Sequence, residues 1–257
     1  MTNESRCILA KYCKAAGSTS CTNQCPHYIS VHGVNGDGGR VGMAGTPKDY
    51  KLLTLTNSPA REGQPAVYAL LDDYVKTFNR QFEEGGARIK SLYLYSKSPG
   101  TGKTTTAVAL MNEWIIVNYL GSLKRGITPT QRPAYFLDVN EFQSRYNLAT
   151  MTGNESELDA IRNEIRCCQI VPFLVMDDIG VRGASDAFRS YLHSIINHRA
   201  THSLPTVYTS NIPLERREHD DAHQKTFAEV FDERLYDRVR DQCAEIRFVG
   251  KSKRGRR

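Results

Sequence analysis

The sequence predicts an α/β fold in which a five-stranded parallel sheet carries helices on both faces. Five short apolar runs alternate along the chain with longer segments whose apolar residues recur at helical spacing. The first of these runs leads through a Gly-containing turn directly into a helix, as in a strand–helix unit. Strands that alternate with helices pair in parallel, and a parallel sheet is covered on both faces. No internal repeat of fixed period is present.

The expected elements follow from these two patterns in chain order. The apolar runs predict strands at residues 91–96, 134–139, 172–177, 206–210 and 244–249. The helical spacing predicts helices at residues 66–82, 102–119, 155–169, 185–199 and 227–240.

The composition is that of a globular protein with a substantial core. Of the 257 residues, 40% are hydrophobic and 24% are charged, and the 34 basic and 28 acidic residues give a net charge of +6. This mild positive charge fits a nucleic-acid partner without requiring one. No apolar run is long enough to cross a membrane and no signal peptide begins the chain, so we expect a cytoplasmic protein without a membrane partner.

The composition also divides the chain into three parts. Residues 1–46 are rich in Cys and end in a Gly-rich stretch, residues 33–46, which we interpret as a linker or an irregular loop. Residues 47–250 form the predicted α/β domain. Residues 251–257 hold five Lys or Arg side chains. This basic tail fits either phosphate binding without sequence preference or a disordered, solubilising end.

A phosphate-binding loop follows the first predicted strand and opens the next helix. Small residues let backbone N–H groups approach a phosphate, and the positive end of the helix dipole faces the anion. Lys103 is expected to reach the terminal phosphates of ATP, and the Thr104 hydroxyl to bind Mg²⁺. Lys97 stands where such loops usually begin with Gly. The residues of the loop are Ser98, Pro99, Gly100, Thr101, Gly102, Lys103, Thr104 and Thr105.

Polar side chains end the third and fourth predicted strands. Asp177 and Asp178 follow four apolar residues, and Asn211 follows the fourth strand. The carboxyl ends of parallel strands meet at one edge of a sheet, so we expect Asp177 to hold Mg²⁺ and Asp178 to polarise the attacking water. Asn211 is expected to contact the terminal phosphate or that water. The alternatives are a solvated acidic turn and a turn-forming Ser-Asn-x-Pro segment.

Two arginines share one face of the last predicted helix. Arg234 and Arg238 lie four residues apart, directly before the fifth strand. They are candidates for an arginine finger that stabilises the transition-state charge at the ATP of a neighbouring subunit. The alternative is that both are surface side chains paired with nearby carboxylates such as Asp232 or Asp237.

Together these motifs resemble the DnaC/DnaI-type replicative helicase loaders, a group of AAA+ ATPases of bacteria and their phages. The resemblance covers residues 47–250, and its most specific parts are the second, third and fifth motifs. The motifs in chain order are Pro99–Thr105, Leu174–Gly180, Ile195–Arg199, Thr209–Asn211 and Glu233–Arg238.

The resemblance implies an AAA+ core without the helical lid domain of many such proteins. It implies an enzyme that binds and hydrolyses ATP with Mg²⁺, assembles side by side with copies of itself, binds single-stranded DNA and loads the replicative helicase onto it. Lys103, the pair Asp177 and Asp178, and Asn211 match the family's ATPase residues. Arg238 matches its arginine finger best, and Arg234 is the second choice.

Five potential zinc ligands lie within the first 27 residues. Cys7, Cys13, Cys21 and Cys25 could close a tetrahedral site, and His27 could replace one of them. A segment this short buries little core, so a metal would supply its folding free energy. We therefore expect a zinc-binding module. The resemblance to loaders with an N-terminal zinc module that contacts the helicase implies that this module docks a partner. The alternative is a flexible tail with free or redox-active thiols.

Two other functions compete with the helicase loader. One is a transposition-targeting ATPase of the IstB type, which shares much of the same core and uses ATP as a switch. The N-terminal cysteine module favours the loader over it. The other is a zinc-containing replication adaptor with an inactive ATP site, against which the complete set Lys103, Thr104, Asp177 and Asp178 argues.

Overall fold

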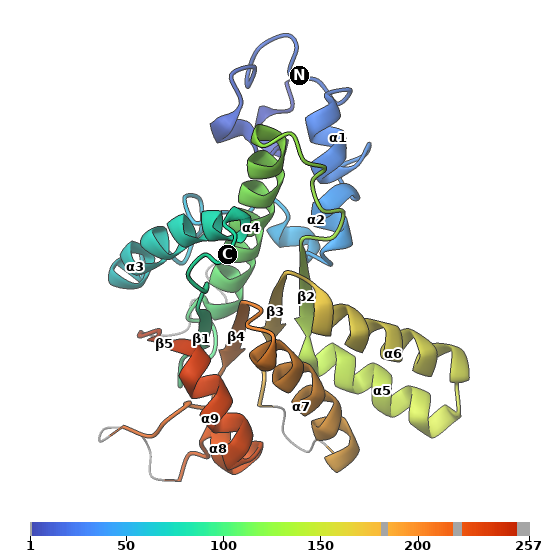
Figure 1. Cartoon of the computed structure of the whole chain (residues 1–257), viewed down its shortest axis with the longest axis vertical. Coiled ribbons are helices and arrows are strands. Elements are labelled where there is room, and N and C mark those ends of the chain that lie inside the picture. Colours follow the sequence, from blue (N-terminus) through green and yellow to red (C-terminus); the bar gives the residue numbers. More distant parts are fainter. Residues whose placement is uncertain (1, 181–184, 218–222, 251–257) are drawn as a thin grey trace.

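The computed structural model describes residues 2–180, 185–217 and 223–250 (Figure 1). The predicted basic tail lies outside these residues. A parallel sheet with the strand order β2-β3-β4-β1-β5 forms the centre of the molecule. This confirms the predicted five-stranded α/β fold, with each strand within two residues of its expected bounds. The strands are β1 (Ser91–Tyr95), β2 (Ala134–Asp138), β3 (Phe173–Asp177), β4 (Thr206–Ser210) and β5 (Cys243–Arg247).

Helices cover both faces of the sheet, and the side chains of each strand alternate between two hydrophobic clusters. Leu92 and Leu94 of β1 point to the first face, whereas Tyr93 and Tyr95 point to the second. The first face is covered by α3 (Pro65–Lys76), the 3-10 helix η4 (Thr77–Phe82) and α4 (Lys103–Lys124). The second face is covered by α5 (Val139–Thr152), α6 (Glu155–Ile170), α7 (Asp186–Thr201), α8 (Phe227–Val230) and α9 (Glu233–Gln242).

The N-terminal residues pack around the C-terminal half of α4 (Figure 1). Ile8, Leu9, Val31, Val41 and Ala44 are buried in the same cluster as the apolar face of α4. The elements of this segment are η1 (Glu4–Arg6), η2 (Ala10–Tyr12), α1 (Pro26–His32), α2 (Gly39–Met43) and η3 (Lys48–Tyr50). The stretch 33–46, expected to be irregular, therefore contains a short helix with buried side chains. The division of the chain at residue 46 stays a prediction.

Two further helices differ from the expected pattern. The sequence did not predict α5, which begins because the carboxylate of Asp138 caps it by accepting the N–H groups of Asn140 and Glu141. The single helix expected at residues 227–240 is two helices. Thr226 caps α8, and Asp232 caps α9 by accepting the N–H of Leu235.

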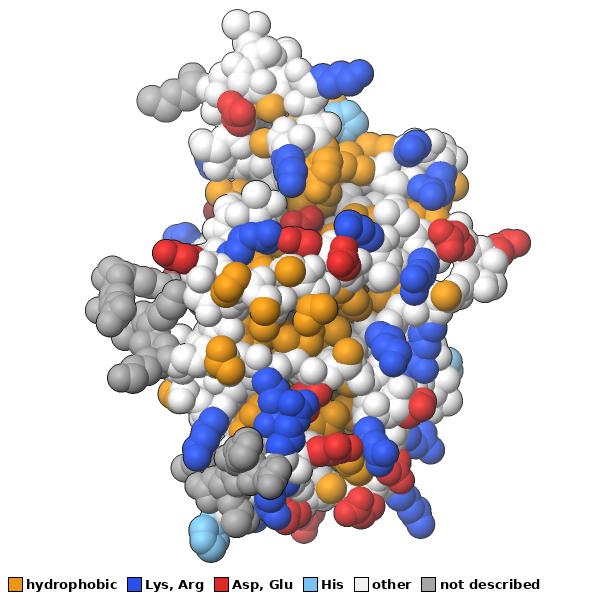
Figure 2. All heavy atoms as spheres, turned by 90° about the vertical axis from the view of Figure 1, so that its left-hand side faces the viewer, with side chains coloured by type: hydrophobic (Ala, Val, Ile, Leu, Met, Phe, Trp, Pro, Cys, Tyr) orange, Lys and Arg blue, Asp and Glu red, His pale blue; other side chains and the backbone are white. Residues whose placement is uncertain are grey.

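The face on the left of Figure 1 combines apolar and charged groups. Figure 2 shows hydrophobic side chains gathered in the middle of this face, with Lys and Arg side chains above and below them. On α3, Ala66, Ala69 and Leu70 are exposed.

No helix in the described parts of the chain is long and apolar enough to span a membrane.

Candidate nucleotide-binding site

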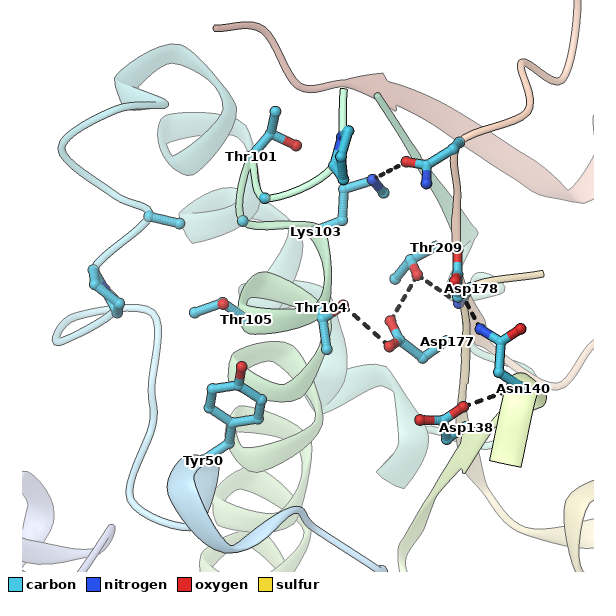
Figure 3. A pocket seen from close by; sticks show the side chains of 16 residues that line it. Tyr50, Thr101, Lys103, Thr104, Thr105, Asp138, Asn140, Asp177, Asp178 and Thr209 are labelled. Atoms are coloured by element: carbon cyan, nitrogen blue, oxygen red, sulfur yellow. Dashed lines mark hydrogen bonds between the residues drawn. The ribbon is translucent and has the colours of Figure 1, made fainter. Parts of the chain in front are cut away.

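A cavity of about 730 Å³ lies at the carboxyl ends of the strands (Figure 3). The loop after β1 forms one wall, and the residues that end β2, β3 and β4 form another. Tyr50, Pro59 and Ala60 add a wall from the segment before α3. All eight predicted loop positions except Ser98 line this cavity. The cavity therefore lies at the edge of the sheet where the sequence predicted the site.

The loop has the backbone shape that a phosphate requires. Gly100 and Gly102 have φ angles of 73° and 104°, which side chains rarely allow. A Cβ at Gly102 would also lie 2.5 Å from the Cβ of Ala60. α4 begins at Lys103, so the N–H groups of its first turn have no carbonyl partners within the helix, and the residues of this turn line the cavity.

The structure brings the predicted polar residues together in two pairs. The ammonium of Lys103 donates to the side-chain oxygen of Asn211, with a distance of 2.6 Å between Nζ and Oδ1. The hydroxyl of Thr104 donates to Asp177, with a distance of 3.0 Å between Oγ1 and Oδ2. The first pair joins α4 to the end of β4, and the second joins α4 to the end of β3.

Asp177 is buried between two threonine hydroxyls. Thr209 on β4 donates to its other carboxylate oxygen at 2.6 Å and accepts the backbone N–H of Asp178 at 2.8 Å. Burial raises the pKa of Asp177 from 3.8 to about 6, although the two hydroxyls act in the opposite direction. A cation beside this carboxylate would favour its ionised form and lower that pKa.

Asp178 stands at the rim of the cavity in a strained backbone conformation. Its φ angle is +58°, in the left-handed region that residues other than Gly adopt infrequently. The side-chain amide of Asn140, at the start of α5, donates to Asp178 with a distance of 2.7 Å between Nδ2 and Oδ2. The backbone N–H of Asn140 also donates to the carboxylate of Asp138, the last residue of β2.

The oxygen ligands around Asp177 fit Mg²⁺. The Thr104 hydroxyl and one buried carboxylate lie side by side, and Mg²⁺ in phosphate sites takes one or two carboxylates together with phosphate and water oxygens. Such a site needs no cluster of three protein ligands. An ion there would neutralise charge on the terminal phosphates.

The two candidate arginines do not line this cavity. Both lie on α9, on the second face of the sheet, and both side chains are exposed. Arg238 donates through Nη1 to the side chains of Asn197 and Thr201 on α7. The alternative, a pairing of Arg234 or Arg238 with Asp232, Glu233 or Asp237, is not present among the described contacts.

The N-terminal cysteines gather around a second cavity but do not form a metal site. Cys7, Cys13, Cys21 and Cys25 line a cavity of about 280 Å³ against the end of α4, and none is in a disulfide. Burial raises the pKa of the Cys7 thiol. Nδ1 of His27 is 2.9 Å from the hydroxyl of Tyr119. Within the described residues, no group of three or more His, Cys, Asp or Glu side chains is arranged to hold a metal, so the structure does not show the predicted zinc site.

The sequence pattern missed six residues that line the main cavity, which are Tyr50, Pro59, Ala60, Asp138, Asn140 and Thr209. Thr209 was seen only as part of a polar strand end, and its contact with Asp177 required the register of β3 beside β4. Asn140 lies two residues after the end of β2, a position that could have drawn notice to it. Tyr50 lies 53 residues before Lys103 in a segment without a recognisable motif, and only the fold brings it to the cavity.

The chain is similar in sequence to one characterised helicase loader. It is 27% identical over 192 residues to the replicative helicase loader DnaI of Bacillus subtilis (strain 168). The matched part is 74% of this chain and 54% of that protein, so the chain spans about half the length of this relative. No family profile matches the sequence.

Solved structures of the same kind share the fold. The crystal structure of the DnaC helicase loader matches with 25% identity and a TM-score of 0.54, over 79% of this chain and 100% of that one. The crystal structure of DnaI matches with 22% identity and a TM-score of 0.52, over 81% of this chain and 94% of that one. The replication initiator DnaA bound to AMPPCP and single-stranded DNA matches the fold with 17% identity and a TM-score of 0.50, over 80% of this chain and 52% of that one. The resemblance to the DnaC/DnaI-type AAA+ loaders is confirmed by sequence and fold together.

Proposed function

We propose that this DnaC/DnaI-like chain is a Mg²⁺-dependent ATPase whose active site is the cavity at the carboxyl ends of the strands. The observation that carries the proposal is the pair of contacts from the first turn of α4, Lys103 to Asn211 and Thr104 to Asp177. These contacts bring a cation, an amide and a carboxylate together beside the loop, which supports phosphate binding there. The fold shared with an AMPPCP-bound protein supports a nucleotide as the ligand.

Each side chain has a distinct part in the proposed reaction. Lys103 and the backbone N–H groups of the loop bind the β- and γ-phosphates, and Asn211 turns from Lys103 to the γ-phosphate or the water. Thr104 and Asp177 hold the Mg²⁺ ion, which neutralises charge on the phosphates. Asp178 accepts a hydrogen bond from the attacking water and orients it for in-line attack. The products are ADP and phosphate.

The first test is the hydrolysis of ATP by the full chain with Mg²⁺, with and without single-stranded DNA. We expect turnover that DNA stimulates and that Lys103→Ala abolishes together with ATP binding. Lys97→Ala is the matched control, because Lys97 is an exposed residue of the same loop that does not line the cavity. A wild type that binds ATP without turning it over would support an adaptor or an IstB-like switch instead.

The biological role proposed for this ATPase is to load a replicative helicase onto single-stranded DNA as an assembly of several copies. The similarity to DnaI and DnaC supports this role. The test is capture of the host's replicative helicase by the full chain, with ATP, with ADP and with Lys103→Ala. Tyr12→Asp and Val34→Asp alter exposed apolar side chains of the N-terminal segment, which we propose as the docking module. If both variants capture the helicase as well as the wild type does, the N-terminal segment is not the docking module.

Zinc binding by the N-terminal cysteines is a separate part of the proposal. The position of all four thiols around one cavity supports it, although their side chains must move to bind one ion. Metal analysis of the purified protein tests it directly. We expect one zinc per chain, lost in the Cys7→Ser/Cys25→Ser double variant and retained in Cys167→Ser. A metal-free wild type with four titratable N-terminal thiols would contradict it.

A further inference from the structure

Arg238 is held on the surface by two side chains of a neighbouring helix. α9 packs against α7, and the Nη1 atom of Arg238 donates to Oδ1 of Asn197 and, at 3.1 Å, to Oγ1 of Thr201. Asn197 and Thr201 lie four residues apart, so they are neighbours on one face of α7. The two acceptors therefore bind a single nitrogen of the guanidinium group, Nη1.

The other edge of this guanidinium has no partner among the described residues. An arginine carries five N–H donors, and the contacts of Arg238 in the described part of the chain use Nη1 alone. Nε and Nη2 therefore remain available to an acceptor outside the subunit. Arg234, one turn earlier on α9, has no such contact within the described residues, so no acceptor restrains it.

The two acceptors of Arg238 carry no charge. Other surface arginines of this chain pair with carboxylates, such as Arg145 with Glu157 and Arg240 with Glu215. A carboxylate would neutralise the guanidinium, whereas an amide and a hydroxyl orient it and leave its positive charge intact. An oriented arginine that keeps its charge suits the terminal phosphates of a nucleotide bound to another copy of the chain.

We propose that Asn197 and Thr201 are positioning residues that fix Arg238 so that its Nε and Nη2 edge donates to the terminal phosphates of ATP on a second copy of this chain. The inference rests on the proposed ATPase function and adds to it the two residues that prepare the arginine. α7 is a suitable support, because the buried Arg199 near its C-terminal end donates to Thr206 of β4 and to the carbonyls of Cys168 and Pro205. Since an unrestrained arginine side chain must lose rotamer freedom when it binds, holding it in advance favours the transition state.

The experiment compares Arg238→Ala, Asn197→Ala, Thr201→Val and the double variant Asn197→Ala/Arg238→Ala. Three quantities are measured: kcat for ATP hydrolysis, Kd for ATP and thermal stability. We expect kcat to fall about 1,000-fold in Arg238→Ala. We expect a fall of about 5- to 20-fold in Asn197→Ala and a smaller one in Thr201→Val, with Kd and thermal stability unchanged. The double variant should equal Arg238→Ala alone. Ser190→Ala, an exposed position on α7, is the control and should match the wild type.

Mixing experiments test whether the contact is made between copies. Lys103→Ala cannot bind ATP but keeps Arg238, whereas Arg238→Ala binds ATP and lacks the arginine. Mixing the two should restore hydrolysis, and a Lys103→Ala/Asn197→Ala partner should restore about 5- to 20-fold less. A smaller deficit with Asn197→Asp than with Asn197→Ala would show that charge retention is unimportant and would overturn that step of the argument.

Different outcomes overturn different statements. If the wild type does not hydrolyse ATP, the proposed function fails and the inference fails with it. If hydrolysis is normal in Arg238→Ala, the ATPase proposal survives but Arg238 is not the trans-acting arginine, and the inference is wrong. If Arg238→Ala is slow but Asn197→Ala is not, or if Asn197→Ala slows the Arg238→Ala variant further, Asn197 does not act through Arg238.

Discussion

The side chains of the cavity are linked across strands by hydrogen bonds, so each one sets the position or the protonation of its neighbour. Thr209 of β4 bonds both the Asp177 carboxylate and the Asp178 backbone, and Asn140 holds the Asp178 side chain. Such a network is pre-arranged before a nucleotide binds, which is the main way in which a protein accelerates phosphoryl transfer. Two predictions follow at the scale of single residues.

The first concerns the pH dependence of stability through Asp177. Its pKa is raised by burial from 3.8 to about 6, so the folded state binds the proton more tightly than the unfolded state does. The folded protein therefore loses stability as pH rises from about 4 to about 6, by roughly 3 kcal/mol in total. In EDTA, Asp177→Asn should be more stable than the wild type at pH 7.5, and this difference should vanish near pH 4. Thermal melting at both pH values measures it. An equal difference at both pH values would contradict this account.

The second concerns the contact between Asn140 and Asp178. An amide that donates to a carboxylate occupies a lone pair that the attacking water of the proposed reaction would use, and it holds the carboxylate toward β2. We expect Asn140→Ala to raise the rate of ATP hydrolysis without DNA several-fold, with little change in ATP affinity. Single-turnover hydrolysis measures it, and Thr150→Ala, an exposed position on the same helix, is the control. A slower reaction would mean that Asn140 assists catalysis instead.

At the scale of the element, α7 owes its fixed position to one buried guanidinium. Arg199 is fully buried and donates to the carbonyls of Cys168, Val171 and Pro205 and to the Thr206 hydroxyl. These acceptors belong to the end of α6 and to the segments that enter β3 and β4. One side chain thus joins α6, α7 and two strands. Burial lowers its pKa only to about 10, so it remains charged at neutral pH.

Replacing this arginine should destabilise the whole fold. Arg199→Ala leaves buried carbonyls without donors and opens a cavity, and we expect it to reduce the free energy of unfolding by about 3–5 kcal/mol. Arg199→Lys should recover only part of this loss, because one ammonium cannot reach all four acceptors. Urea denaturation measures both, with the exposed Arg189→Ala on the same helix as control. A loss below about 1 kcal/mol in Arg199→Ala would show that water replaces the guanidinium.

The sequence predicted those elements and residues whose signal is local. Strands are short apolar runs, and Lys103, Asp177 and Asn211 could be placed together because parallel strands end at the same edge. α5 was missed although Val139, Phe142 and Ala149 on its buried face recur at helical spacing, because most of its other residues are polar and weaken the apolar signal. The contact between Asn197 and Arg238 was not predictable, because it joins residues 41 apart on two helices whose packing only the tertiary structure defines.

At the scale of the whole molecule, the N-terminal segment is packed as part of the core rather than set apart from it. Arg40 is buried and donates to the carbonyls of Ser30, Pro129 and Thr130, and its guanidinium lies 5.0 Å from the ring centre of Tyr119. His32 is buried too, and its Nε2 accepts the N–H of Ile8. Burial lowers the pKa of His32 to about 4, which keeps the ring neutral and able to accept at physiological pH.

Removing residues 1–46 should therefore destabilise the α/β domain as well as weaken any docking function. The deletion exposes the apolar side of α4 that Ile8, Val31 and Val41 cover. We expect the melting temperature to fall by roughly 5–10 °C, which corresponds to about 2–3 kcal/mol for a domain of this size. Differential scanning calorimetry of the full chain and of residues 47–257 measures this. Equal melting temperatures would show that the two parts fold independently.

The length of α4 has a mechanical consequence. Its 22 residues span about 33 Å, from the proposed phosphate-binding turn at one end to the cysteine-lined cavity at the other. A helix that is buried along most of its length does not bend easily. A shift of its first turn therefore translates or rotates the whole of α4. If exchange of ATP for ADP shifts the first turn of α4, the N-terminal segment at the other end of the helix would then move with it, because α4 is continuous between the two.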